Sequence, residues 1–187
     1  MKKFLISIVA VLLIVGVGIY FANQDSKPVK TNDFSSVPGD SQLLNNMTKA
    51  GLDALSAEGT VLHIHQHIDI VINGQPITIP AHVGIGSSFI SPLHIHDTTN
   101  ILHVESPVQK DFTLGQFFDE WGVDFNNQCI GTYCVDATHQ LVVSVNGKQI
   151  DNPRDHVLGS HEEIFISYGT KDQTPQPATS YTFPEGY

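Results

Sequence analysis

The chain has 187 residues, of which 41% are hydrophobic and 15% are charged, and its formal net charge is −10 at pH 7. This composition is typical of a folded chain and excludes an intrinsically disordered one. An acidic surface repels phosphate backbones, so it excludes nucleic acid as a partner.

The N-terminal segment carries a membrane-targeting pattern. Lys2 and Lys3 precede an uncharged, largely apolar run over 4–22, which is long enough to cross a bilayer as a helix. Tyr20 stands where a signal-peptidase site requires a small residue. We therefore predict an uncleaved signal-anchor over residues 1–22, with the membrane as a partner and a cleaved, secretory signal as the alternative. The positive-inside rule then places the rest of the chain outside the cytoplasm, in the periplasm or at the cell surface.

Three further segments follow the anchor. Residues 23–58 begin with polar residues and prolines and are predicted to be a linker, with a short helix indicated by apolar spacing over 42–56. Residues 59–169 are predicted to form one β-rich domain of ordinary size. Residues 170–187 are rich in Pro and Thr and are predicted to be a loose C-terminal tail.

The β domain opens with a strand, predicted over 60–72, whose alternate residues differ in chemistry. Successive side chains on a strand point to opposite faces. Three histidines and an aspartate would therefore share one face, opposite an apolar one: His63, His65, His67 and Asp69. Asn73-Gly74 then predicts a tight hairpin turn, a returning strand over 75–80 and a loop over 81–92.

A second histidine cluster lies on a hairpin predicted over 93–106, with its turn at 97–100. This turn length pairs His94 with His103 and His96 with Ile101 in antiparallel register. Facing side chains on paired strands lie about 4.5–5.5 Å apart at Cβ. Four potential metal ligands then share one face of the hairpin: His94, His96, His103 and Glu105.

One helix is predicted with strong signals over 112–122. Thr113 and Gln116 form a capping box, and Gly122 is a suitable C-terminal cap. Its apolar stripe is interpreted as the core contact against a sheet and consists of Leu114, Phe117, Phe118 and Trp121. A third hairpin over 141–150 and a last strand over 163–168 complete an α+β fold, mainly antiparallel β with one packed amphipathic helix, preceded by the transmembrane helix.

Cys129 and Cys134 are the two cysteines of the chain. Outside the cytoplasm the default state of such a pair is a disulfide. Their spacing differs from the C-x-x-C of redox and zinc sites, so a thiolate metal pair or free thiols are the alternatives and no catalytic role is assigned.

The clustered histidines predict a metal site. Imidazole is the commonest metal ligand in proteins, and two histidines at i and i+2 on a strand can reach one ion. The predicted ligands are His94, His96 and His103, with His63, His65 and His67 forming a second site or completing the first. Glu105 is a candidate fourth ligand, partner of a ligating imidazole or general base, and Asp97 and Asp69 are candidates to orient ligating imidazoles.

The predicted cofactor is a transition metal ion, copper or zinc, because imidazole and carboxylate ligands suit them. Only two methionines occur, which disfavours a methionine-rich Cu(I) carrier. The chain is therefore predicted to be a metal-binding protein. Two alternatives stay open: a metal-dependent enzyme with an open three-histidine site, in which Glu105 would be catalytic, and a metal-free module that responds to pH. Four isolated histidines are interpreted as structural: His82, His139, His156 and His161.

Some motifs resemble known families. His94-x-His96 resembles the H-x-H of cupins and of Cu/Zn superoxide dismutase, but the cupin glutamate four or five residues on and the dismutase Gly-Asp loop are missing. Stretches such as L-H-I-H-Q-H-I-D-I, S-P-L-H-I-H-D, I-L-H-V-E and F-T-L-G-Q-F-F-D-E-W-G-V, within 57–169, resemble an uncharacterised group of secreted or membrane-anchored prokaryotic proteins. That resemblance implies a shared domain and no particular activity or partner. Residues 112–169 are also similar to β-grasp-like domains.

Overall fold

A computed structural model describes residues 34–187. The predicted signal-anchor over 1–22 and the first part of the predicted linker lie outside the described residues. Within them no helix is both long and apolar enough to span a bilayer. The described elements, in chain order, are α2 Asp40–Ala50, β1 Leu62–Ile72, β2 Gln75–Ile77, β3 Leu93–His94, β4 Ile101–Ser106, α3 Leu114–Trp121, β5 Cys129–Ile130, β6 Tyr133–Cys134, β7 His139–Val145, β8 Lys148–Gln149, the 3-10 turn η1 Pro153–Asp155 and β9 Glu162–Thr170.

The main sheet has seven strands in the order β3-β4-β1-β9-β7-β8, with β2 paired to the far end of β1. All neighbours are antiparallel except β1 and β9, which are parallel. The predicted α+β class is therefore confirmed for the described residues. The parallel pair at the centre was not predicted, because it joins strands from opposite ends of the domain.

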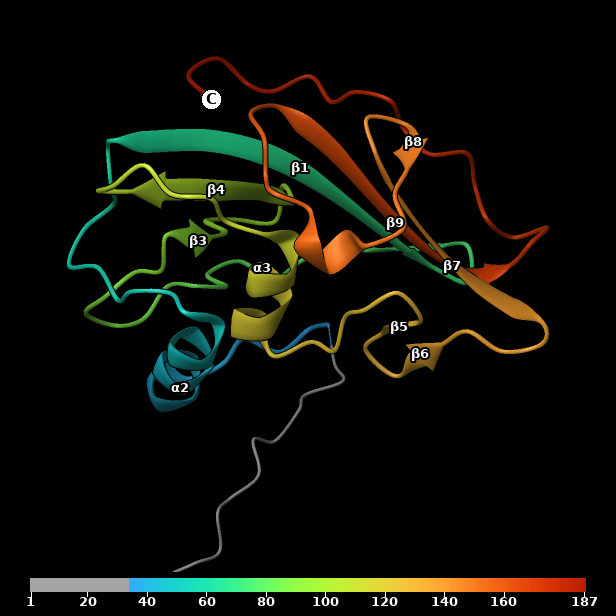
Figure 1. The fold of residues 1–187 in the computed structure, drawn as a ribbon, viewed down its shortest axis with the longest axis horizontal. Coiled ribbons are helices and arrows are strands. Elements are labelled where there is room, and N and C mark those ends of the chain that lie inside the picture. The colour runs from blue at the N-terminus through green and yellow to red at the C-terminus, as the bar shows by residue number, and fades with distance from the viewer. Residues whose placement is uncertain (1–33) are drawn as a thin grey trace, which may run out of the picture.

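Helices α2 and α3 cover one face of the sheet (Figure 1). All four residues of the predicted apolar stripe of α3 are completely buried, and each such side chain contributes about 1.5–3 kcal/mol when removed from water. The capping box of Thr113 and Gln116 is present, and Gly122 ends the helix with a left-handed φ of 82°. The predicted helix, its cap and its buried face are thus confirmed.

Strand β1 has an apolar face and a histidine-bearing face, as its alternating sequence predicts. Ile68, Ile70 and Ile72 belong to the hydrophobic core beneath the helices. The alternate residues, which include His65 and His67, point to the opposite face of the sheet. The isoleucines that anchor β1 in the core therefore hold its histidines on the opposite face.

Two tight turns set the hairpin registers. Asn73 and Asn146 have positive φ values of 51° each, and the glycines that follow them have φ values of 77° and 79°. Positive φ at both central residues defines the type I′ turn, which matches the twist of antiparallel strands. Both Asn-Gly hairpins are therefore as predicted.

The C-terminal segment 171–187 contains no helix or strand, but it crosses the sheet face opposite to the helices (Figure 1). Gln140 donates to Thr174 Oγ1 at 3.0 Å, and the Tyr181 ring stacks on His67 with centroids 3.8 Å apart. A loose tail was expected, whereas these contacts attach the segment to the histidine face.

The predicted disulfide is confirmed: Cys129 and Cys134 are bonded and face each other on the β5–β6 hairpin. This small hairpin lies on the helix side of the molecule (Figure 1). Its Cys134 carbonyl accepts from the hydroxyl of Tyr168 at 3.0 Å, and His139 stacks on the ring of the same tyrosine.

Candidate metal centre

Three histidines stand in one row across three adjacent strands. His94 on β3 pairs with His103 on β4, and His103 pairs with His65 on β1. Neighbouring strands lie about 4.8 Å apart, and the ring centroids agree: 5.2 Å between His94 and His103, and 4.5 Å between His103 and His65. The hairpin register predicted from the turn length is confirmed for the first of these pairs.

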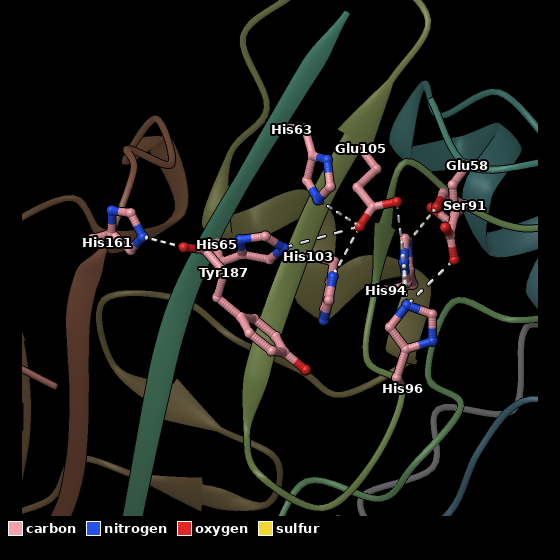
Figure 2. A network of polar contacts seen from close by, with 10 residues as sticks. All are labelled: Glu58, His63, His65, Ser91, His94, His96, His103, Glu105, His161 and Tyr187. Atoms are coloured by element: carbon pink, nitrogen blue, oxygen red, sulfur yellow. Dashed lines mark hydrogen bonds and ion pairs between the residues drawn. The ribbon is translucent and has the colours of Figure 1, made fainter. Parts of the chain in front are cut away.

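Three further side chains extend the row. Glu105 follows His103 on the same face of β4 and pairs with His63 on β1. His96 lies just beyond the end of β3, and its ring centroid is 4.5 Å from that of His103. Figure 2 shows Glu105 among these rings. Five histidines and one glutamate therefore gather in one cluster, which we call the His5Glu cluster and which consists of His63, His65, His94, His96, His103 and Glu105.

The adjacency of β1 and β4 resolves which histidines belong together. His63 and His65 join the His94–His103 hairpin, so the first histidine strand completes the second cluster at that end. His67 is set apart, because its partners come from β9 on the other side of β1.

His94 has the geometry of a ligand held in a fixed tautomer. Its Nδ1 donates to the Ser91 carbonyl oxygen at 2.9 Å, which leaves the lone pair of Nε2 available. That Nε2 lies 3.2 Å from Nε2 of His96. Two nitrogens bound tetrahedrally to one zinc ion at about 2.0–2.1 Å would be about 3.3 Å apart. A backbone carbonyl that orients an imidazole in this way is a common feature of metal sites.

Glu105 touches both sides of the cluster. Its Oε1 lies 2.9 Å from Nδ1 of His103 and 3.3 Å from Nε2 of His63. Its Oε2 lies 4.0 Å from Nε2 of His94. Oε1 is also 4.0 Å from Nε2 of His65. A single carboxylate therefore faces all the strands that carry the histidines.

The protonation states favour ligation. Burial, together with nearby His103, lowers the pKa of His65 to about 4, and burial lowers that of His94 to about 4. Burial alone would raise the pKa of Glu105, but its hydrogen bond with His103 and the neighbouring imidazoles outweigh burial and lower it. At neutral pH the cluster thus offers neutral imidazole at His65 and His94 and a carboxylate at Glu105, the forms that bind metals.

Some side chains of the cluster are buried and others are exposed to solvent. The side chains of His65, His94 and Glu105 are at most 5% exposed, whereas those of His63 and His96 are 50% and 40% exposed. The buried members are fixed by packing, and the exposed members open the cluster to solvent. An ion could therefore reach the site without unfolding of the sheet.

Two quartets within the His5Glu cluster could each hold a metal ion. In each, one donor atom per residue lies within 4.8 Å of all the others. The quartets share His103 and Glu105; one adds His63 and His65, and the other adds His94 and His96. Four imidazole or carboxylate donors complete a tetrahedral zinc site or a copper site.

A third group lies beside the cluster. His67, Asp69 and Glu163 also have donor atoms within 4.8 Å of one another. His67 Nδ1 is 2.8 Å from Glu163 Oε2, and Glu163 Oε1 is buried without a hydrogen-bond partner. Burial raises the pKa of Glu163 despite its bond with His67. The two side chains thus share one buried hydrogen bond, and the second carboxyl oxygen of Glu163 stays without a partner. Asp69 belongs to this group, and its role in orienting a ligating imidazole stays a prediction.

The remaining predicted residues have other contacts. The Asp97 carboxylate accepts from the backbone N–H and hydroxyl of Thr99, at 2.8 and 2.5 Å, and so stabilises the turn. The four isolated histidines stay outside the cluster. His139 contacts Asp136, His156 contacts Glu162, and His161 contacts the Tyr187 backbone oxygen.

Several residues around the cluster were not identified from the sequence. Glu58 Oε1 lies 3.4 Å from Nε2 of His96, and the Tyr187 ring lies against His65 and His103. Glu120 of α3 accepts from the Ser91 hydroxyl and thereby supports the segment that orients His94. None of these residues carries a local sequence signal, because each meets the cluster through long-range folding.

The loop before β3 requires a glycine at position 84. Its φ is +79°, and a Cβ at this position would lie 2.2 Å from the Leu93 carbonyl oxygen and 3.0 Å from Cβ of His94. Glycine is therefore required for the loop to pack against β3. A larger residue would displace the strand that carries His94.

Comparison with known proteins gives no relative: no protein-family model, curated protein or solved structure matches the chain. The function must accordingly be argued from the His5Glu cluster itself.

Proposed function

We propose that the protein binds a transition metal ion, copper or zinc, through the His5Glu cluster, in a domain that the N-terminal anchor tethers to the outer side of a membrane. The principal ligands are His94, His96 and His103, with Glu105 as the fourth donor and His63 and His65 in reach of the same carboxylate. This assignment keeps the ligands predicted from the sequence and separates His67 from them.

The observation that carries the proposal is the arrangement around His94. Its Nδ1 is occupied by the Ser91 carbonyl, and its Nε2 faces His96 Nε2 at 3.2 Å and Glu105 Oε2 at 4.0 Å. Without an ion, the Nε2 atoms of His94 and His96 lie at hydrogen-bonding distance from each other. A bound ion would instead accept a lone pair from each of them.

The donor set supports copper or zinc over harder ions. Magnesium and calcium prefer an all-oxygen coordination shell, whereas the His5Glu cluster contains five imidazoles and one carboxylate. Imidazole-rich sets suit zinc and copper. The disulfide between Cys129 and Cys134 supports an oxidising compartment, in agreement with a domain outside the cytoplasm.

The proposal is tested by measuring metal content. The full chain, purified in detergent and stripped with a chelator, is dialysed against Zn(II) or Cu(II) and analysed by mass spectrometry. We expect stoichiometric metal in the wild type and loss of it, or at least tenfold weaker binding, when His94 and His103 are both changed to Ala. The matched control is His82→Asn at an exposed position with positive φ, which asparagine tolerates. Absence of metal from the wild type would refute the proposal.

A metal-dependent enzyme is the second candidate. A surface groove lined by Ser56–Glu58 and Gly86–Ile90 includes Glu58, whose carboxylate contacts His96. A small substrate in this groove would lie beside the metal. The same metal-loaded protein should then hydrolyse or oxidise small model substrates, and His96→Ala should reduce that rate more than it reduces metal content.

A pH-responsive module is less well supported. The pKa of His65 and that of His94 are about 4, so these two histidines do not change charge near pH 6. A switch in that range would have to rest on the remaining histidines. Metal binding makes use of the neutral state that the fold imposes on His65 and His94.

A further inference from the structure

The His5Glu cluster contains more donors than one ion can use. A zinc ion in a structural site takes four protein ligands, and one in a catalytic site takes three. The cluster offers six residues, arranged as two quartets that overlap at His103 and Glu105. A second ion, or an unused pair of histidines, is the only way to account for all six.

The two unshared pairs are built alike. Each is an H-x-H segment with one buried and one exposed histidine. In the pair on β1 the exposed fractions of the side chains are 5% for His65 and 50% for His63; in the pair at β3 they are 0% for His94 and 40% for His96. Each pair thus has one anchored imidazole and one that solvent can reach.

Glu105 lies between the pairs and turns a different oxygen to each. Oε1 faces His63 at 3.3 Å and His65 at 4.0 Å, while Oε2 faces His94 at 4.0 Å. Figure 2 shows the His63–His65 pair on one side of the carboxylate and the His94–His96 pair on the other. Carboxylates that bridge two metal ions in this way hold them about 3.5–4 Å apart.

From this arrangement we propose that the cluster is a two-metal centre bridged by Glu105. One ion is held by His63, His65 and Oε1, and the other by His94, His96 and Oε2. The proposal rests on the proposed function, because it concerns the number of ions at the same cluster.

His103 makes the two positions unequal. A histidine bound through one nitrogen can serve one ion only, so His103 gives one position four protein donors and leaves the other with three. An ion with three protein donors keeps an open coordination position for water or a substrate. The centre would therefore combine a closed site with an open one.

Charge is compatible with this assignment. Glu105 is held as a carboxylate by His103 and the neighbouring imidazoles, despite its burial. Glu58 adds a half-exposed carboxylate 3.4 Å from His96. Imidazoles bind metal ions in their neutral form, so they add no further charge to either coordination shell.

The test uses Cu(II) as the probe on the full, chelator-stripped chain in detergent. Copper per chain is measured after equilibrium dialysis, and electron paramagnetic resonance detects the half-field transition that closely spaced Cu(II) pairs produce. The wild type should bind two ions and show this transition. The double variants H63A/H65A and H94A/H96A should each bind one ion and show none. Glu105→Gln should weaken the second ion at least tenfold.

Two controls define where the second ion lies. His82→Asn and His67→Gln should both behave as wild type. If His67→Gln instead removes one of the two ions and no half-field transition is seen, the second ion belongs to the group of His67, Asp69 and Glu163, and the two-metal centre is refuted. Circular dichroism of each stripped variant checks folding; where a double variant fails to fold, His63→Ala and His96→Ala should each weaken one ion only.

The outcomes also separate this inference from the proposed function. In one outcome the wild type binds one ion at His94, His96 and His103, and H63A/H65A binds that ion equally well. This result refutes the bridged pair of ions but leaves the proposed function standing. A wild type that binds no ion at all refutes both.

Discussion

At the scale of single residues, burial decides how His65 and His94 respond to acid. His65 and His94 have pKa values of about 4, against 6.5 for a free histidine, chiefly because burial disfavours the charged imidazolium. Between these values the unfolded chain binds more protons than the folded one, so stability falls as the pH falls. The contribution is fully present above about pH 6.5 and is lost on approach to pH 4.

We therefore predict that metal-free His94→Gln loses less stability than the wild type between pH 7 and pH 4.5. A pKa lowered from 6.5 to about 4 corresponds to roughly 3 kcal/mol over the full range, so the difference should reach roughly 2 kcal/mol by pH 4.5. Urea unfolding at the two pH values measures it. His82→Asn, at an exposed site, should retain the wild-type slope; equal slopes for all three proteins would contradict the prediction.

Glu120 makes the folding stability depend on pH in the opposite direction. Complete burial raises its pKa well above 4.5, and the Ser91 hydroxyl lowers it only in part. The folded state therefore favours the protonated carboxyl, and stability decreases as the pH rises from 4.5 towards the raised pKa. This neutral acid sits beneath the segment that carries the Ser91 carbonyl to His94.

Replacing Glu120 by Gln removes the carboxyl group and with it this dependence of stability on pH. We predict that Glu120→Gln is within about 1–2 kcal/mol of wild type at pH 5 and gains stability relative to it at pH 8. Chemical unfolding at both pH values tests this, with Glu58→Gln, at a half-exposed site, as the matched control. A constant difference between Glu120→Gln and wild type across the pH range would show that Glu120 is ionised in the folded protein.

At the scale of elements, turn and helix-cap motifs in the sequence predicted the features that depend on neighbouring residues alone. The turn at 97–100 sets the register that pairs His94 with His103, and the capping box sets the start of α3. The adjacency of β1 and β4 could not be predicted, because the pairing of strands distant in sequence depends on the whole core. The sequence therefore left open whether His63 and His65 join the second cluster, and it gave no sign of Glu163 or Glu120.

The C-terminal segment was the largest element-scale difference from expectation. Tyr181 covers His67, and Tyr187 covers His65 and His103. A composition rich in proline and threonine predicts that a segment forms no helix or strand. It does not predict that aromatic side chains of the segment pack on a sheet distant in sequence. The segment thus lies over the histidine face.

This placement predicts that Tyr187 slows exchange of the bound metal. Tyr187→Ala should release metal to a chromogenic chelator several-fold faster than wild type, because His65 and His103 become more exposed. Tyr181→Ala is the matched control, since it uncovers His67 alone and should leave the rate unchanged. Equal release from both variants and wild type would mean that the segment does not restrict access to the cluster.

At the scale of the whole molecule, the sheet separates two functions. One face packs against α2 and α3 and supplies the hydrophobic core, while the C-terminal segment crosses the other face (Figure 1). There Tyr181 and Tyr187 contact His67, His65 and His103. The chain as a whole is acidic, with a net charge of −10, and such a charge attracts cations. The proposed anchor would hold this surface on the outer side of the membrane.

The orientation of the chain gives the last prediction. With alkaline phosphatase fused after Tyr187 in a bacterial host, the enzyme should be active if the proposed signal-anchor over 1–22 places the domain outside the cytoplasm. An uncleaved anchor keeps the fusion in the carbonate-washed membrane, whereas a cleaved signal releases it. V11R/I14R, which interrupts the apolar run, should leave the fusion inactive in the cytosol, with Cys129 and Cys134 reduced and open to alkylation. Activity that survives V11R/I14R, or a stable wild-type fusion without activity, would contradict the assigned orientation.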